Sequence, residues 1–157
     1  MHINPDHFLQ TETGRVVTPE RNKAAWEKSY EALNEALRNA DPSTRVYVLV
    51  GPQGAGKSTW AKSVAPTLPA SIVFDAILVK KTERQPILAA AKSSSVEAVA
   101  VWFKTPLEVC LSRNASRPID EVVPVQAVRN VHSAIEPPSI AEGFAQVIEV
   151  LADETGA

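Results

Sequence analysis

The chain has 157 residues, 45% of them apolar, with 16 Lys and Arg against 18 Asp and Glu, which gives a net charge of -2. A chain of this length buries roughly two-thirds of its unfolded surface, so a single domain over residues 1–157 is expected without disulfides or a structural metal. The one cysteine, Cys110, excludes an intrachain disulfide and fits a cytoplasmic location. The weak negative charge argues against extended contact with duplex DNA, although a local basic cleft would still hold a short nucleic-acid end.

No membrane partner is expected from the sequence. The longest apolar runs, 46–50 and 98–103, are far shorter than the ~18 to 20 residues that span a bilayer. The first twenty residues contain three acidic side chains and lack an apolar centre, so they do not resemble a secretory signal.

The first long element predicted along the chain is a helix that begins at Thr18-Pro19-Glu20. A hydroxyl cap, a proline in the first turn and an acid near the positive end of the helix dipole are typical of a helix start. Apolar and aromatic residues follow at helical spacing from Trp26 to Leu37, and Asp41-Pro42 ends the pattern.

Four apolar runs predict the strands of a parallel sheet. They cover residues 46–50, 72–74, 98–103 and 146–151, and each interval between them is long enough for a helix. Capping-box patterns predict helix starts at Thr82–Gln85 and at Thr105–Glu108, with Pro106 as the first helical residue of the second. Strands that alternate with helices indicate an α/β fold, with a parallel sheet covered by helices on both faces.

The segment after the first of these strands matches the phosphate-loop pattern G-x-x-x-x-G-K-[ST]. It reads Gly51-Pro52-Gln53-Gly54-Ala55-Gly56-Lys57-Ser58 and continues into Thr59. Such a loop surrounds phosphate oxygens with backbone N–H groups, while the lysine reaches the β and γ phosphates and the serine hydroxyl binds Mg²⁺. We therefore expect Gly51–Thr59 to bind ATP or GTP with Mg²⁺; the alternative is a glycine-rich turn with an ordinary surface lysine.

The residues around this loop resemble the polynucleotide-kinase and zeta-toxin group of P-loop kinases. The resemblance rests on GPQGAGKSTWAK at 51–62, on 72–76 with Arg84, and on 98–103 with 105–114 and Arg117. It implies a three-layer fold with about five parallel strands in the order 2-3-1-4-5, and a lid near residues 113–125. It also implies transfer of the γ-phosphate of ATP to a hydroxyl acceptor.

The N-terminal residues suggest that the chain is circularly permuted relative to this group. The group's acidic strand and long helix normally lie between the phosphate loop and the second acidic strand, but here only residues 58–71 separate these two. Residues 3–8, which contain Asp6, resemble the missing strand end, and the helix after Trp26 resembles its helix. Residues 1–41 would then form a permuted acceptor-side segment, and residues 45–151 the nucleotide-binding core.

Four side chains outside the loop are candidates for the chemistry. Asp6 would orient or deprotonate the acceptor hydroxyl, or else cap a helix that starts at Asn4-Pro5-Asp6. Asp75 ends a buried strand and would bind Mg²⁺ together with Ser58, or else bond to a nearby turn. Arg113 and Arg117 would stabilise the transferring phosphate from the lid, or else face solvent.

The predicted function is that of a Mg²⁺-dependent P-loop kinase. The acceptor stays open between a nucleic-acid 5′-hydroxyl and a small sugar or nucleotide, and the sequence gives no oligomeric state. The alternative is a nucleotide-binding switch or ATPase module without phosphotransfer. The three tryptophans, Trp26, Trp60 and Trp102, are expected in the core instead of acting as base-stacking platforms.

Overall fold

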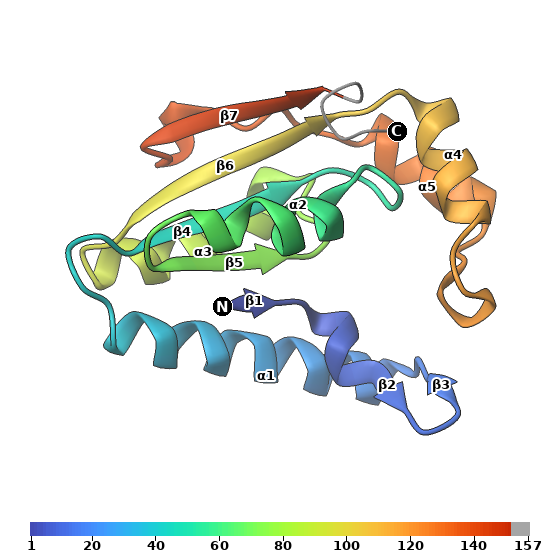
Figure 1. Cartoon of the computed structure of the whole chain (residues 1–157), viewed down its shortest axis with the longest axis horizontal. Coiled ribbons are helices and arrows are strands. Elements are labelled where there is room, and N and C mark those ends of the chain that lie inside the picture. Colours follow the sequence, from blue (N-terminus) through green and yellow to red (C-terminus); the bar gives the residue numbers. More distant parts are fainter. Residues whose placement is uncertain (152–157) are drawn as a thin grey trace.

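A five-stranded, all-parallel sheet with helices on both faces forms the centre of the computed structural model, which describes residues 1–151 (Figure 1). The strand order is β1-β5-β4-β6-β7. The strands are β1 (His2–Ile3), β4 (Arg45–Val50), β5 (Ser71–Asp75), β6 (Glu97–Lys104) and β7 (Gln146–Leu151). The helices are α1 (Pro19–Arg38), α2 (Lys57–Ser63), α3 (Lys81–Ser93), α4 (Leu107–Ala115) and α5 (Val125–Ser133).

Short elements connect these parts. Four 3₁₀ turns cover Pro5–Leu9, Ala65–Thr67, Ile119–Glu121 and Ile140–Glu142. A small antiparallel hairpin, β2 (Gln10–Thr11) with β3 (Gly14–Arg15), lies between the first 3₁₀ turn and α1; the sequence patterns did not predict it. No helix in the described part of the chain has the length and apolar character needed to cross a bilayer.

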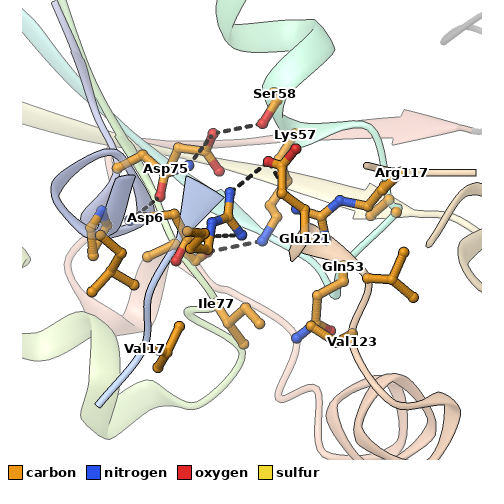
Figure 2. A pocket seen from close by; sticks show the side chains of 18 of the residues that line it. Asp6, Val17, Gln53, Lys57, Ser58, Asp75, Ile77, Arg117, Glu121 and Val123 are labelled. Atoms are coloured by element: carbon orange, nitrogen blue, oxygen red, sulfur yellow. Dashed lines mark hydrogen bonds and ion pairs between the residues drawn. The ribbon is translucent and has the colours of Figure 1, made fainter. Parts of the chain in front are cut away.

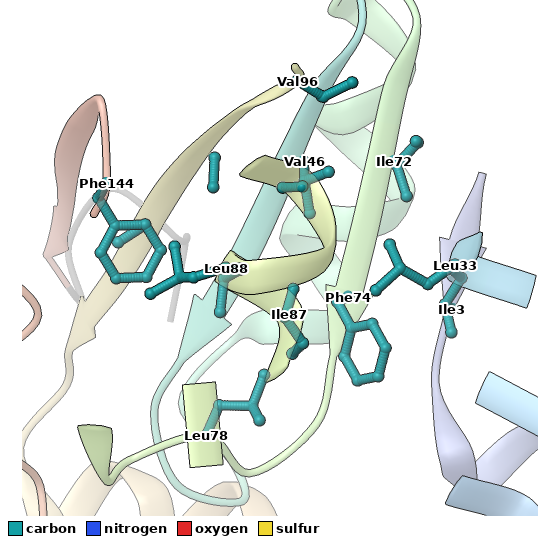
Figure 3. Close-up of a cluster of buried hydrophobic side chains, with 14 of the residues drawn as sticks. Ile3, Leu33, Val46, Ile72, Phe74, Leu78, Ile87, Leu88, Val96 and Phe144 are labelled. Carbon is teal, nitrogen blue, oxygen red and sulfur yellow. The ribbon is translucent and has the colours of Figure 1, made fainter. Parts of the chain in front are cut away.

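Alternating residues of the central strand β4 fill two separate cores. Val46, Val48 and Val50 point into the layer with α1 and α3, where they pack with Phe74 and other apolar side chains (Figure 3). Tyr47 and Leu49 point to the opposite face, in a second cluster that contains residues of α2, α4 and α5. A strand that is buried on both faces explains why residues 46–50 form a continuous apolar run instead of an alternating one.

The predicted strands and the first long helix are confirmed to within one or two residues. The hydroxyl of Thr18 accepts a hydrogen bond from the backbone N–H of Arg21 at 3.1 Å, so Thr18 caps α1 as expected. The β4–α2–β5 unit connects neighbouring parallel strands, with Val46 opposite Ile72.

Two predicted helix starts are wrong. Helix α3 begins before Thr82, and the carboxylate of Glu83 accepts a hydrogen bond from the N–H of Lys80 at 3.0 Å. Helix α4 begins at Leu107, with Pro106 as its N-cap residue and not as its first helical residue. The hydroxyl of Thr105 is not a cap, because the N-cap is Pro106 and no side chain accepts a capping hydrogen bond there; the Thr105 hydroxyl donates to the phosphate loop.

Candidate nucleotide site

The phosphate loop adopts a backbone shape that depends on glycine. Gly56, the N-cap of α2, has φ +106°, and Gly54 has φ +77°. A Cβ atom at Gly54 would collide with the carbonyl oxygen of Cys110, because α4 packs directly against the loop. Any larger residue at Gly54 would therefore push the loop and α4 apart.

Two side chains fix the loop from the α4 side. The Thr105 hydroxyl donates a hydrogen bond to the Ala55 carbonyl at 2.9 Å, in a fully buried position. Arg113 Nη1 donates to the Gly54 carbonyl at 3.4 Å. Because both contacts use loop carbonyls, they occupy no loop N–H group that could bind an anion; the Ala55 N–H itself donates to the Pro52 carbonyl at 3.2 Å.

The loop opens into a cavity of about 850 Å³ that brings the predicted site residues together (Figure 2). Its lining includes loop residues 53–59 and the six side chains of Asp6, Lys57, Ser58, Asp75, Arg113 and Arg117. Gly51 and Pro52 are buried and are not among the residues that line the cavity, and their part in nucleotide binding stays a prediction.

Asp75 lies at the carboxyl end of β5 and is the most densely hydrogen-bonded carboxylate of this cavity. Its Oδ2 accepts hydrogen bonds from His2 Nε2 at 2.8 Å, Asn4 Nδ2 at 3.3 Å and the Ser58 hydroxyl at 3.3 Å. Burial alone would raise the pKa of the Asp75 carboxyl, but the His2 hydrogen bond and the charge of Lys57 outweigh it and hold this pKa below its ordinary value. Asp75 is therefore ionised at neutral pH.

Ser58 and Asp75 form an oxygen pair suited to Mg²⁺. The Ser58 hydroxyl and the Asp75 carboxylate are within hydrogen-bond reach of each other, at the N-terminus of α2 and at the end of β5. Mg²⁺ prefers oxygen ligands and is commonly held by one or two protein oxygens together with substrate phosphates. The donor set therefore fits the ion that the phosphate loop implies.

Lys57 points across the cavity toward the end of β5. Its ammonium donates a hydrogen bond to the Ala76 carbonyl at 3.1 Å. Burial lowers the pKa of Lys57, while the carboxylates of Asp75 and Asp6 act in the opposite direction. The amine thus lies in a weakly solvated position between two acids, where a phosphate would replace the carbonyl as its partner.

Asp6 lies on the 3₁₀ turn that follows β1, and it does not cap that turn. The Asn4 side chain is the cap, since its Oδ1 accepts a hydrogen bond from the Asp6 N–H at 2.9 Å. The alternative of Asp6 as a helix cap is therefore wrong. Its carboxylate is 45% exposed and lies 3.4 Å from Arg15 Nη1.

The lid segment between α4 and α5, residues 116–124, is held against the N-terminal hairpin. Arg15 Nη2 lies 2.6 Å from Glu121 Oε1, and the Arg15 N–H donates to Asp120 Oδ2 at 2.7 Å. Arg117 lies in the same cluster, 3.9 Å from Glu121. Both arginines of the predicted lid region, residues 113–125, line the cavity: Arg117 follows α4, and Arg113 lies on α4 and contacts the loop backbone.

Four residues of this site were not found from the sequence. His2 and Asn4 reach Asp75 only because β1 pairs with β5, and Arg15 reaches the lid only because of the unexpected hairpin. Thr105 did carry a sequence signal, but the capping-box pattern assigned its hydroxyl to the wrong partner.

Comparison with known families supports the nucleotide-binding interpretation. A family model described as "AAA domain", a P-loop NTPase-type domain, matches residues 64–138. The match covers just under half of the chain and begins after the phosphate loop, so it is independent of the Gly51–Ser58 motif. A search of curated proteins found no match. The loop, the five-stranded parallel sheet and this match together give the chain the α/β fold of the P-loop NTPases.

Proposed function

We propose that this chain is a Mg²⁺-dependent kinase that transfers the γ-phosphate of ATP to a hydroxyl group. The observation that carries the proposal is the position of Asp6: a carboxylate from the N-terminal segment lines the same cavity as Lys57, Ser58 and Asp75. Phosphotransfer needs a group that orients the acceptor hydroxyl, and Asp6 would supply it; the same position would let Asp6 orient a water molecule in an ATPase, so the two functions are separated by whether an acceptor takes the phosphate.

The strand order supports a circularly permuted kinase of the polynucleotide-kinase and zeta-toxin type. Numbered from the phosphate-loop strand β4, the order 2-3-1-4-5 puts strand 3 at β5 and strand 2 at β1. The first strand of this chain thus occupies the place that strand 2 takes in that group. Helix α1 follows it and packs on the same core as β5, as the group's long helix would.

The side chains divide the chemistry as follows. The acceptor oxygen forms a bond to the γ-phosphorus as the bond from that phosphorus to the β–γ bridging oxygen breaks, and ADP leaves. Asp6 accepts the hydroxyl proton, while Lys57 and Arg117 neutralise charge on the phosphate oxygens. Ser58 and Asp75 would hold Mg²⁺, which neutralises further phosphate charge when bound.

Labelled ATP tests this proposal directly. The protein is incubated with γ-labelled ATP, Mg²⁺ and a panel of nucleosides, oligonucleotides, sugars and simple alcohols, and labelled products are separated from free phosphate. Transfer to any acceptor supports the kinase. Slow release of free phosphate that no acceptor changes would favour the switch or ATPase instead.

A further inference from the structure

The half of the cavity that lies away from Ser58 has an apolar wall. In Figure 2, Val17, Ile77 and Val123 lie on the opposite side of Lys57 from Ser58. The wall is built by three separate parts of the chain, namely the N-terminal segment with α1, the end of β5 and the lid. Val17, Ile77 and Val123 form this wall, and the other large apolar side chains that line the same cavity are Leu9, Trp26 and Val122.

In the proposed kinase, this wall would face the acceptor and not the nucleotide. The ammonium of Lys57, which reaches β and γ phosphates in such loops, points to the carbonyl of Ala76. The wall begins at the next residue, Ile77, and continues along the N-terminal segment that carries Asp6. A molecule whose hydroxyl contacts Asp6 would therefore rest its body against this wall.

Trp26 gives the cavity a fixed aromatic surface. Its ring lies 6.0 Å from that of Tyr30 and 6.1 Å from that of Phe74, which is fully buried in the core. The side chain is half-buried and also lines the cavity. Trp26 was expected in the core, and its ring does pack on Tyr30 and Phe74, but it also lines the cavity. These ring contacts hold Trp26 in place without a ligand.

Charge in the cavity disfavours an anionic acceptor. Among the described lining residues the basic ones are Arg15, Lys57, Arg113 and Arg117. Lys57 and Arg113 contact backbone carbonyls at the site of the nucleotide phosphates. Arg15 and Arg117 contact Glu121, and Arg15 also contacts Asp6.

Acidic side chains complete this region. Asp120 and Glu121 line the cavity on the lid side, opposite Asp6. In this cavity a phosphate group on the acceptor would thus meet three carboxylates, and each described lining cation has an acidic partner or a place at the loop; the further cation near Asp6 is Lys62, which lines the smaller adjoining cavity. Like charges at such close range cost binding free energy, which makes an uncharged acceptor the better electrostatic fit.

We infer that the acceptor is an uncharged alcohol with an apolar or aromatic body, and this inference rests on the proposed kinase function. The body packs between Trp26, Ile77 and the lid residue Val123, with its hydroxyl directed at Asp6. Gln53 Oε1 is buried and has no hydrogen-bond partner in the part of the chain that the structure describes, so it offers one acceptor for a polar group of this molecule.

A matched pair of acceptors tests whether the site disfavours an acceptor that carries a phosphate group. Thymidine and thymidine 3′-monophosphate share one 5′-hydroxyl and one aromatic base, and they differ in the phosphate. We expect kcat/KM for thymidine, or for 2-phenylethanol, to exceed that for the monophosphate about tenfold or more. Equal or better use of the monophosphate would overturn the inference and leave the kinase function standing. Failure of both neutral alcohols to bind the ATP-loaded protein, measured by ligand-observed NMR, would also overturn it.

Two variants of Ile77 test whether the apolar wall binds the acceptor. Ile77→Ala should lower kcat/KM for the neutral acceptor by about 10- to 200-fold, and Ile77→Asp should lower it further, with unchanged ATP affinity. Ile140→Asp, at an exposed position outside the cavity, is the control. If the Ile77 variants transfer phosphate as well as the wild type, the wall does not bind the acceptor.

Calorimetric titration of every variant with ATP and Mg²⁺ separates a failure of the proposed kinase function from a failure of the acceptor assignment. A wild-type protein that binds no nucleotide refutes the proposed function itself. Normal nucleotide binding together with acceptor use insensitive to phosphate and to Ile77 refutes the acceptor assignment alone. Nucleotide binding also shows that a variant is folded, so a loss of transfer is not misread as misfolding.

Discussion

The guanidinium of Arg15 joins the N-terminal hairpin to the lid, since its Nη2 lies 2.6 Å from Glu121 Oε1 while its Nη1 lies 3.4 Å from Asp6. The Arg15 side chain is 12% exposed, and its Nε is buried without a hydrogen-bond partner among residues 1–151. The contact therefore connects the proposed base to the predicted lid segment, which lines the cavity. Arg15 and Glu121 are 106 residues apart in the sequence.

Loss of this contact should loosen the lid. In Arg15→Met, the amides of residues 116–124 should exchange with deuterium about tenfold faster or more, because a charge-assisted hydrogen bond no longer opposes opening. Hydrogen–deuterium exchange with mass spectrometry measures this. The control is Arg45→Met, which removes an exposed ion pair with Glu97 outside the lid. Unchanged lid exchange in Arg15→Met would show that the lid is held by other contacts.

Lys57→Ala should abolish most of the nucleotide affinity. Charged hydrogen bonds of this kind contribute ~1.5–3 kcal/mol, which corresponds to about 10- to 150-fold weaker binding. Isothermal titration with ATP and Mg²⁺ gives the dissociation constant. Lys92→Ala, at an exposed position in the last turn of α3, should bind ATP like the wild type. Equal affinity in the two variants would mean that the loop does not bind phosphate through Lys57.

Arg84 should contribute to stability and not to catalysis. Its guanidinium is fully buried, and it bonds to both carboxylate oxygens of Glu142 at 2.9 Å and to the carbonyls of Leu78 and Glu136. Arg84→Met should lower the free energy of unfolding by about 3–5 kcal/mol, because it leaves the Glu142 charge buried without its partner.

The exposed pair of Arg45 and Glu97 is the matched control for Arg84. Breaking it in Arg45→Met should cost about 0–1 kcal/mol. Urea denaturation monitored by circular dichroism compares the two variants. Similar losses of stability in both would contradict a special role for the buried pair.

Cys110 should react slowly in the folded protein. Its thiol is fully buried on α4, and burial raises the pKa of this group, so little thiolate forms near neutral pH. Ellman's reagent should label it slowly in buffer and rapidly in urea. Rapid labelling of the native protein would show that α4 separates readily from the phosphate loop that it supports.

The main architecture was predictable because it follows from local pattern. The β4 residues Val46–Val50 form a continuous apolar run since both sheet faces are covered, and the loop motif fixes what comes next. The position of β1 could not follow from periodicity, because a two-residue strand has none. It was inferred from the resemblance of residues 3–8 to a kinase strand end.

The partners of the site residues were less predictable than the residues themselves. Asp75 was recognised as a strand-end carboxylate, but its contact with His2 depends on the pairing of β1 with β5. Thr105 looked like a helix cap because Glu108 follows at capping-box spacing. In the folded chain Pro106 is the N-cap and the Thr105 hydroxyl donates to the Ala55 carbonyl, a tertiary contact that the local pattern could not reveal.

Asp6→Asn tests whether Asp6 serves phosphotransfer from a permuted N-terminal segment. Loss of a general base lowers the rate by about 100- to 10,000-fold, while the amide keeps the size of the side chain. Glu31→Gln, at an exposed position on α1, is the control and should transfer phosphate normally.

The decisive measurement is single-turnover transfer from labelled ATP to the best acceptor of the panel, made alongside ATP titration of the same samples. If Asp6 is the general base, Asp6→Asn binds ATP like the wild type and transfers the phosphate at least about 100-fold more slowly. Transfer at the wild-type rate in Asp6→Asn would contradict this role.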